Sequence, residues 1–175
     1  MINERNRYDK KDSLELGNSA EIFFYRISQN RGWSIKKSSD NENINEHWDF
    51  LIEKHGEKYR VEVKSMKRIS RDDTDVQDEW VWIEFHGVRD YDLGWLFGGK
   101  SELIAFEQKD RFFIVKRESL ILLAANVVDF SVSVQESKDA KYKLYQRSGR
   151  PDKMSLIESK KLKPILWDEW KKENN

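Results

Sequence analysis

Apolar residues near the start of the chain recur at the spacing expected for a helix. Ser13 precedes this run as a suitable N-cap, and Gly32 follows it as a suitable C-terminal residue. The apolar positions between them are Leu14, Ala20, Phe23, Phe24 and Ile27. The pattern predicts a helix between Ser13 and Gly32, with the polar residues 1–12 as a loose N-terminal segment.

Short runs rich in β-branched and aromatic residues predict that the middle of the chain forms strands. Their expected bounds are 33–36, 47–54, 58–67, 79–85, 103–106, 112–115 and, at a sheet edge, 142–145. Polar or glycine-rich segments between them predict loops at 38–46 and 69–78 and a tight turn at 94–99. Helical patterns return at 118–126 and, behind Pro164, at 165–172. We therefore expect one α/β domain over residues 1–175, with a mixed, mostly antiparallel central sheet flanked by helices.

One predicted hairpin gathers charged residues on one of its faces. His55-Gly56 is its turn signal, because glycine adopts a positive φ without steric cost. A turn centred there places Asp49 opposite Glu62. The same register places His47 opposite Lys64, and alternation along the strands puts these four side chains on one face. The opposite, core-forming face then carries Trp48, Phe50, Ile52, Val61 and Val63.

The two facing carboxylates are the most informative chemical feature of this hairpin. Their Cβ atoms would lie about 5 Å apart, a distance at which like charges destabilise the pairing. A divalent cation would remove this conflict, because hard cations bind carboxylate oxygens. The alternative is an ordinary solvated hairpin face that carries a glutamate and a lysine.

The set Asp49…Glu62-Val63-Lys64 resembles the PD-(D/E)XK nuclease superfamily, the fold of many restriction enzymes and Holliday-junction resolvases. In this resemblance, clearest over residues 13–67, Asp49 matches the first acid, Glu62 the second acid and Lys64 the lysine. Trp48 stands where the family motif has proline, which is absent from many members. A later stretch, 82–107, is similar to superfamily nucleases of phages and large viruses.

The resemblance implies a restriction-endonuclease-like core and metal-dependent cleavage of DNA. It implies that Asp49 and Glu62 hold Mg²⁺ or Mn²⁺, with the Val63 carbonyl as a further oxygen ligand. Glu21, on the preceding helix, matches the helix glutamate that many members use as an extra ligand. Such an ion polarises a phosphate oxygen and lowers the pKa of a bound water. Lys64 would position that water or stabilise the developing charge.

Two further side chains are candidates for the same site. His47 is expected to support the site or to contact phosphate, the alternative being a polar residue at the end of a strand. Glu84 alternates with Trp82 and could face the site, but the pattern favours a solvated face.

Charge and composition narrow the possible partners. Lys and Arg total 32 and Asp and Glu total 32, so the net charge of zero implies no general polyanion-binding surface. Contact with DNA would then need a local basic group, the alternative being ordinary solubilising charge. The candidate residues of that group are Lys36, Lys37, Lys67, Arg68 and Arg71.

The expected location follows from what the sequence lacks. Absence of cysteine excludes disulfides and thiolate metal sites and agrees with a reducing compartment. Residues 1–7 are charged without an apolar signal region, and no apolar run has the length of a membrane span. We expect a cytoplasmic protein without a membrane partner, of prokaryotic, phage or viral type by the resemblance.

The function expected from these features is that of a metal-dependent DNA endonuclease. The same core also serves exonucleases, nickases and junction resolvases, and the sequence does not choose among them. Two other classes remain: a non-catalytic nucleic-acid-binding module with this fold, and an interaction domain whose aromatic surface binds protein. Symmetric cleavage of duplex DNA would favour a homodimer.

Overall fold

The computed structural model describes residues 4–173, with side chains described from Leu14 onward. The helices are α1 (Glu4–Asn30), α2 (Asp40–Glu46), α3 (Gly94–Gly98) and α4 (Arg117–Val127), with short 3₁₀ helices η1 (Ser137–Asp139) and η2 (Ser159–Ile165). The strands are β1 (Ser34–Lys37), β2 (Phe50–Lys54), β3 (Glu57–Lys64), β4 (Trp80–His86), β5 (Leu103–Glu107), β6 (Arg111–Lys116), β7 (Asp129–Val134), β8 (Lys143–Tyr145), β9 (Lys153–Glu158) and β10 (Leu166–Lys171).

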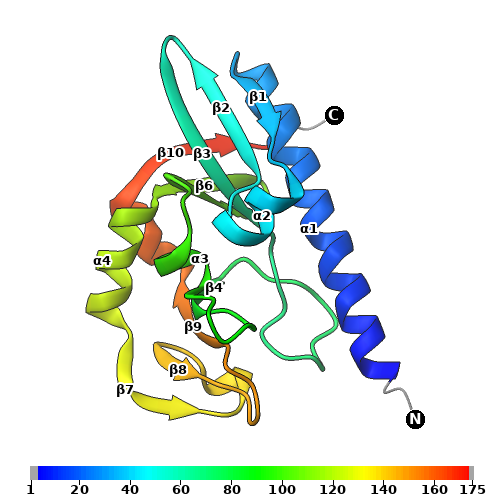
Figure 1. Ribbon diagram of the computed structural model, residues 1–175, viewed down its shortest axis with the longest axis vertical. Coiled ribbons are helices and arrows are strands. Elements are labelled where there is room, and N and C mark those ends of the chain that lie inside the picture. Colours follow the sequence, from blue (N-terminus) through cyan, green and yellow to red (C-terminus); the bar gives the residue numbers. More distant parts are fainter. Residues whose placement is uncertain (1–3, 174–175) are drawn as a thin grey trace.

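These strands form two sheets rather than the single central sheet expected from the sequence. The larger sheet has the order β1-β2-β3-β5-β6-β10, in which only the β3–β5 pair is parallel. The smaller sheet has the order β4-β9-β8-β7, with β7 and β8 parallel. The predicted α/β class, with mixed sheets flanked by helices, is confirmed (Figure 1).

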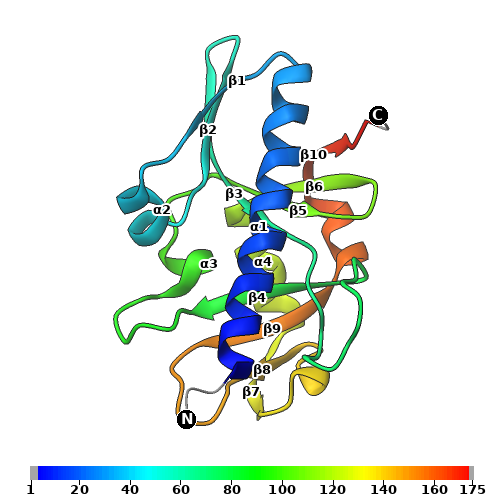
Figure 2. The same cartoon turned by 90° about the vertical axis from the view of Figure 1, so that its right-hand side faces the viewer.

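The larger sheet is covered on both faces. Figure 2 shows α1 running along one face, where Ala20, Phe24 and Ile27 follow one another at helical spacing and are buried. On the other face lie α3, α4 and strands β4 and β9 of the smaller sheet. Because both faces are covered, every residue of β5 is buried and its sequence is almost continuously apolar. Side chains that alternate along β5 and β6 therefore divide between two cores.

The predicted hairpin is present, and its register places Asp49 opposite Glu62 as expected, but the predicted pairing of His47 with Lys64 is wrong because His47 ends α2 in a left-handed conformation before β2 begins. β2 and β3 pair from Phe50 opposite Val61 to Lys54 opposite Glu57. His55 and Gly56 form the two-residue turn with φ values of 52° and 84°, as a hairpin turn with two positive φ values requires. Four of the five residues expected on its core face pack under α1, namely Phe50, Ile52, Val61 and Val63. Trp48 is also buried, and its indole N–H donates to Glu46 at 3.0 Å.

Gly32 ends α1 as predicted, but the predicted start of this helix is wrong. Gly32 has φ 80°, and the N–H of the following Trp33 donates to the Ser28 carbonyl at 3.0 Å, which closes the helix end. Ser13 lies inside α1 and is not its N-cap. Residues 4–12, expected to be loose, are helical, whereas 1–3 lie outside the described residues.

Four other expectations are corrected. The expected loop 38–46 contains α2, whose N-terminus has a reciprocal capping box between Ser39 and Glu42. The expected turn 94–99 is the short helix α3, and strand β8 lies inside its sheet rather than at the edge. The expected helix 165–172 is strand β10, because β6 offers it a partner and the buried Trp170 completes the core under α1.

Among the described residues, no helix combines the length and the apolar character needed to cross a membrane. The longest helix, α1, carries many charged residues and presents its buried stripe to the sheet.

Gly94 holds α3 tightly against β4 and provides a test of this packing. It has φ 71°, and a Cβ there would lie 3.0 Å from the His86 nitrogen and 3.1 Å from the Glu84 carbonyl oxygen. Gly56 has a similar φ, but a Cβ there meets nothing within 4 Å. We expect Gly56→Ala to lower the free energy of unfolding by about 1 kcal/mol, and Gly94→Ala to lower it by at least about 2 kcal/mol. Urea unfolding measures both variants, and equal losses would show that the crowding around Gly94 relaxes freely.

Candidate functional site

Asp49, Glu62 and Lys64 lie together at the open end of the hairpin. Asp49 immediately precedes β2, and continuation of the pairing by one step places it opposite Glu62 on β3. The two carboxylates are only 6% and 7% exposed, so the expected solvated or open face is instead a buried one. The cause is the covering layer, because the face of β3 that carries Glu62 continues into the core formed with α3 and β4.

Asp49 is held by hydrogen bonds to both of its carboxylate oxygens. Asn43 of α2 donates its side-chain amide to Oδ1 at 2.7 Å, and the Val63 backbone N–H donates to Oδ2 at 2.7 Å. Burial, and then the charges of Glu62 and Glu21, raise the pKa of Asp49 to about 7 despite the Val63 hydrogen bond and the Lys64 ammonium. Asp49 is therefore poised between its neutral and ionised forms near neutral pH.

Glu62 and Lys64 form a partly buried ion pair. The Lys64 ammonium donates to Glu62 Oε1, while Oε2 of the same carboxylate is buried and accepts no hydrogen bond from any described residue. The Lys64 Nζ also lies 4.8 Å from the ring centre of Trp95, a cation–π distance. Burial opposes the charged form of Lys64, but the attraction of Glu62 and then Asp49 outweighs it and raises the lysine pKa.

Glu84 is a third acid beside this ion pair, contrary to the solvated position that its pattern favoured. It is half-buried on β4, and its Oε1 accepts the Trp95 backbone N–H at 3.3 Å. Burial raises the pKa of Glu84, and the nearby Lys64 ammonium partly offsets that rise. The alternation of β4 indicated the face of Glu84, but the layer that faces it comes from residues distant in sequence.

His47 points toward Asp92 and takes part in a polar cluster next to the acids. His47 has φ 53° at the end of α2, and its Nε2 lies 3.0 Å from Asp92 Oδ1. Asp92 also accepts the Gly94 N–H at 2.9 Å and a guanidinium N–H of Arg89 at 3.3 Å. Burial opposes ionisation of Asp92, but the hydrogen bonds from His47 and Gly94 lower its pKa. The sequence did not indicate Asp92, since one aspartate in a polar loop carries no signal.

Glu21 and the expected basic residues are only partly gathered around the acids. Glu21 projects from α1, accepts the Lys37 ammonium at 3.2 Å, and contributes to the raised pKa of Asp49. The Lys67 side chain is exposed overall, but desolvation of its ammonium and then the charge of Lys64 lower its pKa, which places it at the margin of the site.

The remaining members of the basic group lie in two separate places. Lys36 is exposed on β1 beside Lys37. Arg68, whose guanidinium approaches the Thr74 carbonyl, and the exposed Arg71 lie on the segment that follows β3. That segment and β1 lie apart in both Figure 1 and Figure 2, so the structure does not form one continuous basic patch from them.

The described residues contain no group of three or more His, Cys, Asp or Glu side chains arranged to hold a metal ion. The oxygen atoms best placed for a hard cation are those of Asp49 and Glu62, because they belong to two neighbouring carboxylates and one of them lacks a hydrogen bond.

The raised pKa of Asp49 predicts a pH-dependent stability. Between the unfolded pKa near 3.8 and the folded pKa of about 7, folding takes up a proton, so the stability contributed by Asp49 is present in acid and is lost as pH rises. Asp49→Asn removes this titration. The free energy of unfolding of Asp49→Asn, relative to that of the wild type, should therefore rise between about pH 4 and about pH 8. The rise should be about 1.4 kcal/mol for each unit by which folding raises the pKa of Asp49.

Chemical denaturation at a series of pH values measures this difference. Glu57→Gln, an exposed acid in the same hairpin, is the matched control and should show little pH dependence relative to the wild type. A difference between Asp49→Asn and wild type that is constant across this pH range would contradict the raised pKa.

The motif resemblance to the PD-(D/E)XK superfamily rests on Asp49, Glu62 and Lys64, which the structure brings to adjoining positions. Comparison with protein-family models, with curated proteins and with solved structures gave no match for this chain.

Proposed function

We propose that this protein is a metal-dependent DNA endonuclease whose acids are Asp49 and Glu62 and whose catalytic cation is Lys64. The observation that carries the proposal is the buried pair of carboxylates, one with a raised pKa and the other with an oxygen that no described residue satisfies. Buried acids of perturbed pKa next to a lysine are characteristic of reactive sites. The helix α1 before the hairpin and the motif on β3 agree with the resemblance to the nuclease superfamily.

The donor atoms fit Mg²⁺ or Mn²⁺, which prefer carboxylate oxygens and need few protein ligands. Asp49 and Glu62 would hold the ion, with the Val63 carbonyl and Glu21 as further ligands by the resemblance. When bound, the ion would polarise a phosphate oxygen and lower the pKa of a coordinated water.

The residues of the chain supply orientation and charge around that site. The Val63 N–H and the Asn43 amide fix the Asp49 carboxylate, so its oxygens are held in place before substrate arrives. Lys64 is fixed between Glu62 and the Trp95 ring, which leaves its ammonium next to the acids. From there it would stabilise the negative charge that develops on phosphorus-bound oxygens.

DNA is the proposed substrate, and its backbone would meet basic side chains at the margin of the site. Lys67 lies close enough to Glu84 and Glu62 for their charges to act on its ammonium, and Arg68 and Arg71 continue along the same segment. Lys36 and Lys37 on β1 would contact another part of the backbone. Cleavage of both strands of a duplex would use two copies of the chain, so we propose a homodimer for that activity. A cytoplasmic location is proposed with it, in line with the absence of cysteine.

A second candidate is a nucleic-acid-binding module that does not cut. It is favoured by one observation: both oxygens of Asp49 and one oxygen of Glu62 already have partners within the protein. In that role the acids and Lys64 would be a structural network, and the variants below would change stability but not any cleavage.

The acids are tested by cleavage of supercoiled plasmid in Mg²⁺. Asp49→Asn and Glu62→Gln should each reduce the cleavage rate by at least about 100-fold, because each removes a charged ligand from the site. Both variants keep the shape of the side chain, and circular dichroism checks that they fold. Glu57→Gln is the matched control and should cut like the wild type. Undiminished cutting by either site variant would show that its carboxylate is not needed.

Lys64 is tested by separating catalysis from binding. Lys64→Gln should lower the cleavage rate by at least about 100-fold while the affinity for duplex DNA, measured without divalent cation, changes little. Lys58→Gln, on the same strand and exposed, is the control for loss of one positive charge. If Lys64→Gln weakened binding and cleavage in equal proportion, Lys64 would be a phosphate anchor rather than a catalytic group.

A further inference from the structure

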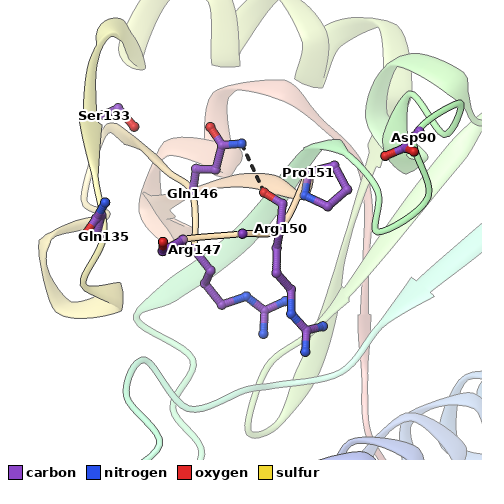
Figure 3. A pocket seen from close by; sticks show the side chains of 9 residues that line it. Asp90, Ser133, Gln135, Gln146, Arg147, Arg150 and Pro151 are labelled. Atoms are coloured by element: carbon purple, nitrogen blue, oxygen red, sulfur yellow. Dashed lines mark hydrogen bonds between the residues drawn. The ribbon is translucent and has the colours of Figure 1, made fainter.

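A polar pocket lies outside the candidate active site, between the loop that joins β8 to β9 and the segment between β4 and α3. Its volume is about 460 Å³. The residues that line it are Asp90, Ser133, Gln135, Gln146, Arg147, Ser148, Gly149, Arg150 and Pro151. Figure 3 shows that the side chains of Arg147 and Arg150 extend from this loop in the same direction. The lining contains no large apolar side chain, so the pocket suits a charged or polar ligand.

Arg147 is held in place by Asp152, but not all of its hydrogen-bond donors have partners among the described residues. One of its terminal nitrogens donates to Asp152 Oδ2 at 2.6 Å, and Asp152 is buried at 3% exposure. Its Nε is also buried and has no hydrogen-bond partner among the described residues. Asp152 Oδ1 is likewise buried without a partner, so the Nε belongs to this ion pair, which fixes the orientation of the guanidinium and leaves its other terminal nitrogen as the donor for a ligand.

Arg150 supplies a second guanidinium without an internal partner. Its side chain is exposed and forms no ion pair with any residue that the structure describes. The loop that presents it is ordered by its own hydrogen bonds. The Arg150 N–H donates to the Arg147 carbonyl at 3.2 Å, and the Gln146 amide donates to the Arg150 carbonyl at 3.1 Å (Figure 3). Gly149 permits the turn with φ 70°.

We propose that this pocket binds one phosphate of the DNA backbone, at a position away from the scissile bond. The inference rests on the proposed nuclease function. Two guanidinium groups match phosphate oxygens in charge and geometry, and the hydroxyls of Ser133 and Ser148 offer further donors. Backbone phosphate contacts of this kind fix the register of a protein on DNA without reading its sequence.

The position of the pocket relates it to the candidate active site. Asp90 lines the pocket, and Asp92, which bonds His47, follows two residues later. Two residues span at most about 7 Å, so the edge of the pocket adjoins the polar cluster beside the acids. On the proposed nuclease function, we infer that a DNA strand with one phosphodiester at Asp49 and Glu62 places another of its phosphates at Arg147 and Arg150. The closeness of the Asp90 edge of the pocket to the His47–Asp92 cluster favours a phosphate of the nucleic-acid backbone over free inorganic phosphate.

The lining of the pocket also includes one negative charge, that of Asp90. Its carboxylate lies across the pocket from Gln135 in Figure 3 and would repel a bound phosphate. Removal of that charge should strengthen DNA binding, whereas removal of the Arg150 charge should weaken it. If DNA lies farther from this surface than the Debye length, neither substitution should change the affinity for DNA.

The experiment is a salt titration of binding to a short DNA duplex, followed by fluorescence anisotropy without divalent cation. Arg150→Gln should weaken binding by about fivefold to tenfold and make the slope of log affinity against log salt shallower by about 0.9, the effect of one phosphate contact. Asp90→Asn should tighten binding by about twofold to fivefold.

Lys138→Gln, which changes an exposed lysine of η1 next to the smaller sheet, is the matched control and should leave affinity and slope unchanged. Arg147→Lys keeps the charge but loses the fork, and should weaken binding at unchanged slope.

The outcomes separate this inference from the proposed function. If Arg150→Gln and Asp90→Asn both bind like the wild type while the wild type still cleaves plasmid, the pocket assignment is wrong and the nuclease assignment stands. If the wild type neither binds nor cleaves DNA, both are wrong. A second titration adds inorganic phosphate instead of DNA at matched ionic strength. NMR spectra follow the Arg147 Nε signal in both titrations. A shift of that signal with phosphate but not with DNA would identify a free-anion pocket and overturn the DNA assignment.

Discussion

The burial of two neighbouring carboxylates is the constraint around which this protein is built. Asp49 and Glu62 are both almost fully removed from water, and like charges so placed repel each other strongly in a low-dielectric interior. The surrounding structure reduces this repulsion with an ion pair and with hydrogen bonds. Lys64 pairs with Glu62, the Val63 N–H and Asn43 bind Asp49, and the remaining conflict appears as the raised pKa of Asp49.

The compensating groups come from several parts of the fold. The hairpin register brings Val63 and Lys64 to the acids, and the capped helix α2 presents Asn43. Trp95 comes from α3, which Gly94 allows to lie close against β4. Because α3 and β4 also form the core behind the larger sheet, the packing of that core and the electrostatics of the acids depend on the same contacts. A change in either is expected to affect the other.

The parts of the fold that could be predicted from sequence are those specified by local signals. The turn at His55-Gly56 and the alternation of the flanking strands were sufficient to give the register that places Asp49 opposite Glu62. Helix α2 was missed because its polar sequence resembles a loop, although Ser39 and Glu42 form the spacing of a capping box. Strand β10 was mistaken for a helix because only its partner β6, more than fifty residues earlier, decides its conformation.

In the candidate site, too, local sequence signals indicated some features and long-range packing decided others. The identity and mutual placement of Asp49, Glu62 and Lys64 follow from a hairpin of neighbouring residues, so the sequence was enough to indicate them. Their burial, and the approach of Glu84 and Trp95, depend on residues 80–95, which fold back over the hairpin. The partner of His47 is Asp92, and no periodic pattern marks that pair. Non-local packing was therefore the part that sequence periodicity could not supply.

The charges of Asp49 and Glu62 are themselves an argument about function. An amide at either position would remove the mutual repulsion, but its single oxygen could not accept both hydrogen bonds that Asp49 receives from Asn43 and from the Val63 N–H. The two carboxylates therefore keep their hydrogen bonds at the cost of a repulsion between neighbouring buried acids. Lys64 neutralises only one of them, and Glu84 adds a third acid nearby. A cation bound between Asp49 and Glu62 would favour the ionised form of Asp49 and remove this repulsion, which is why the acids support the proposed metal site.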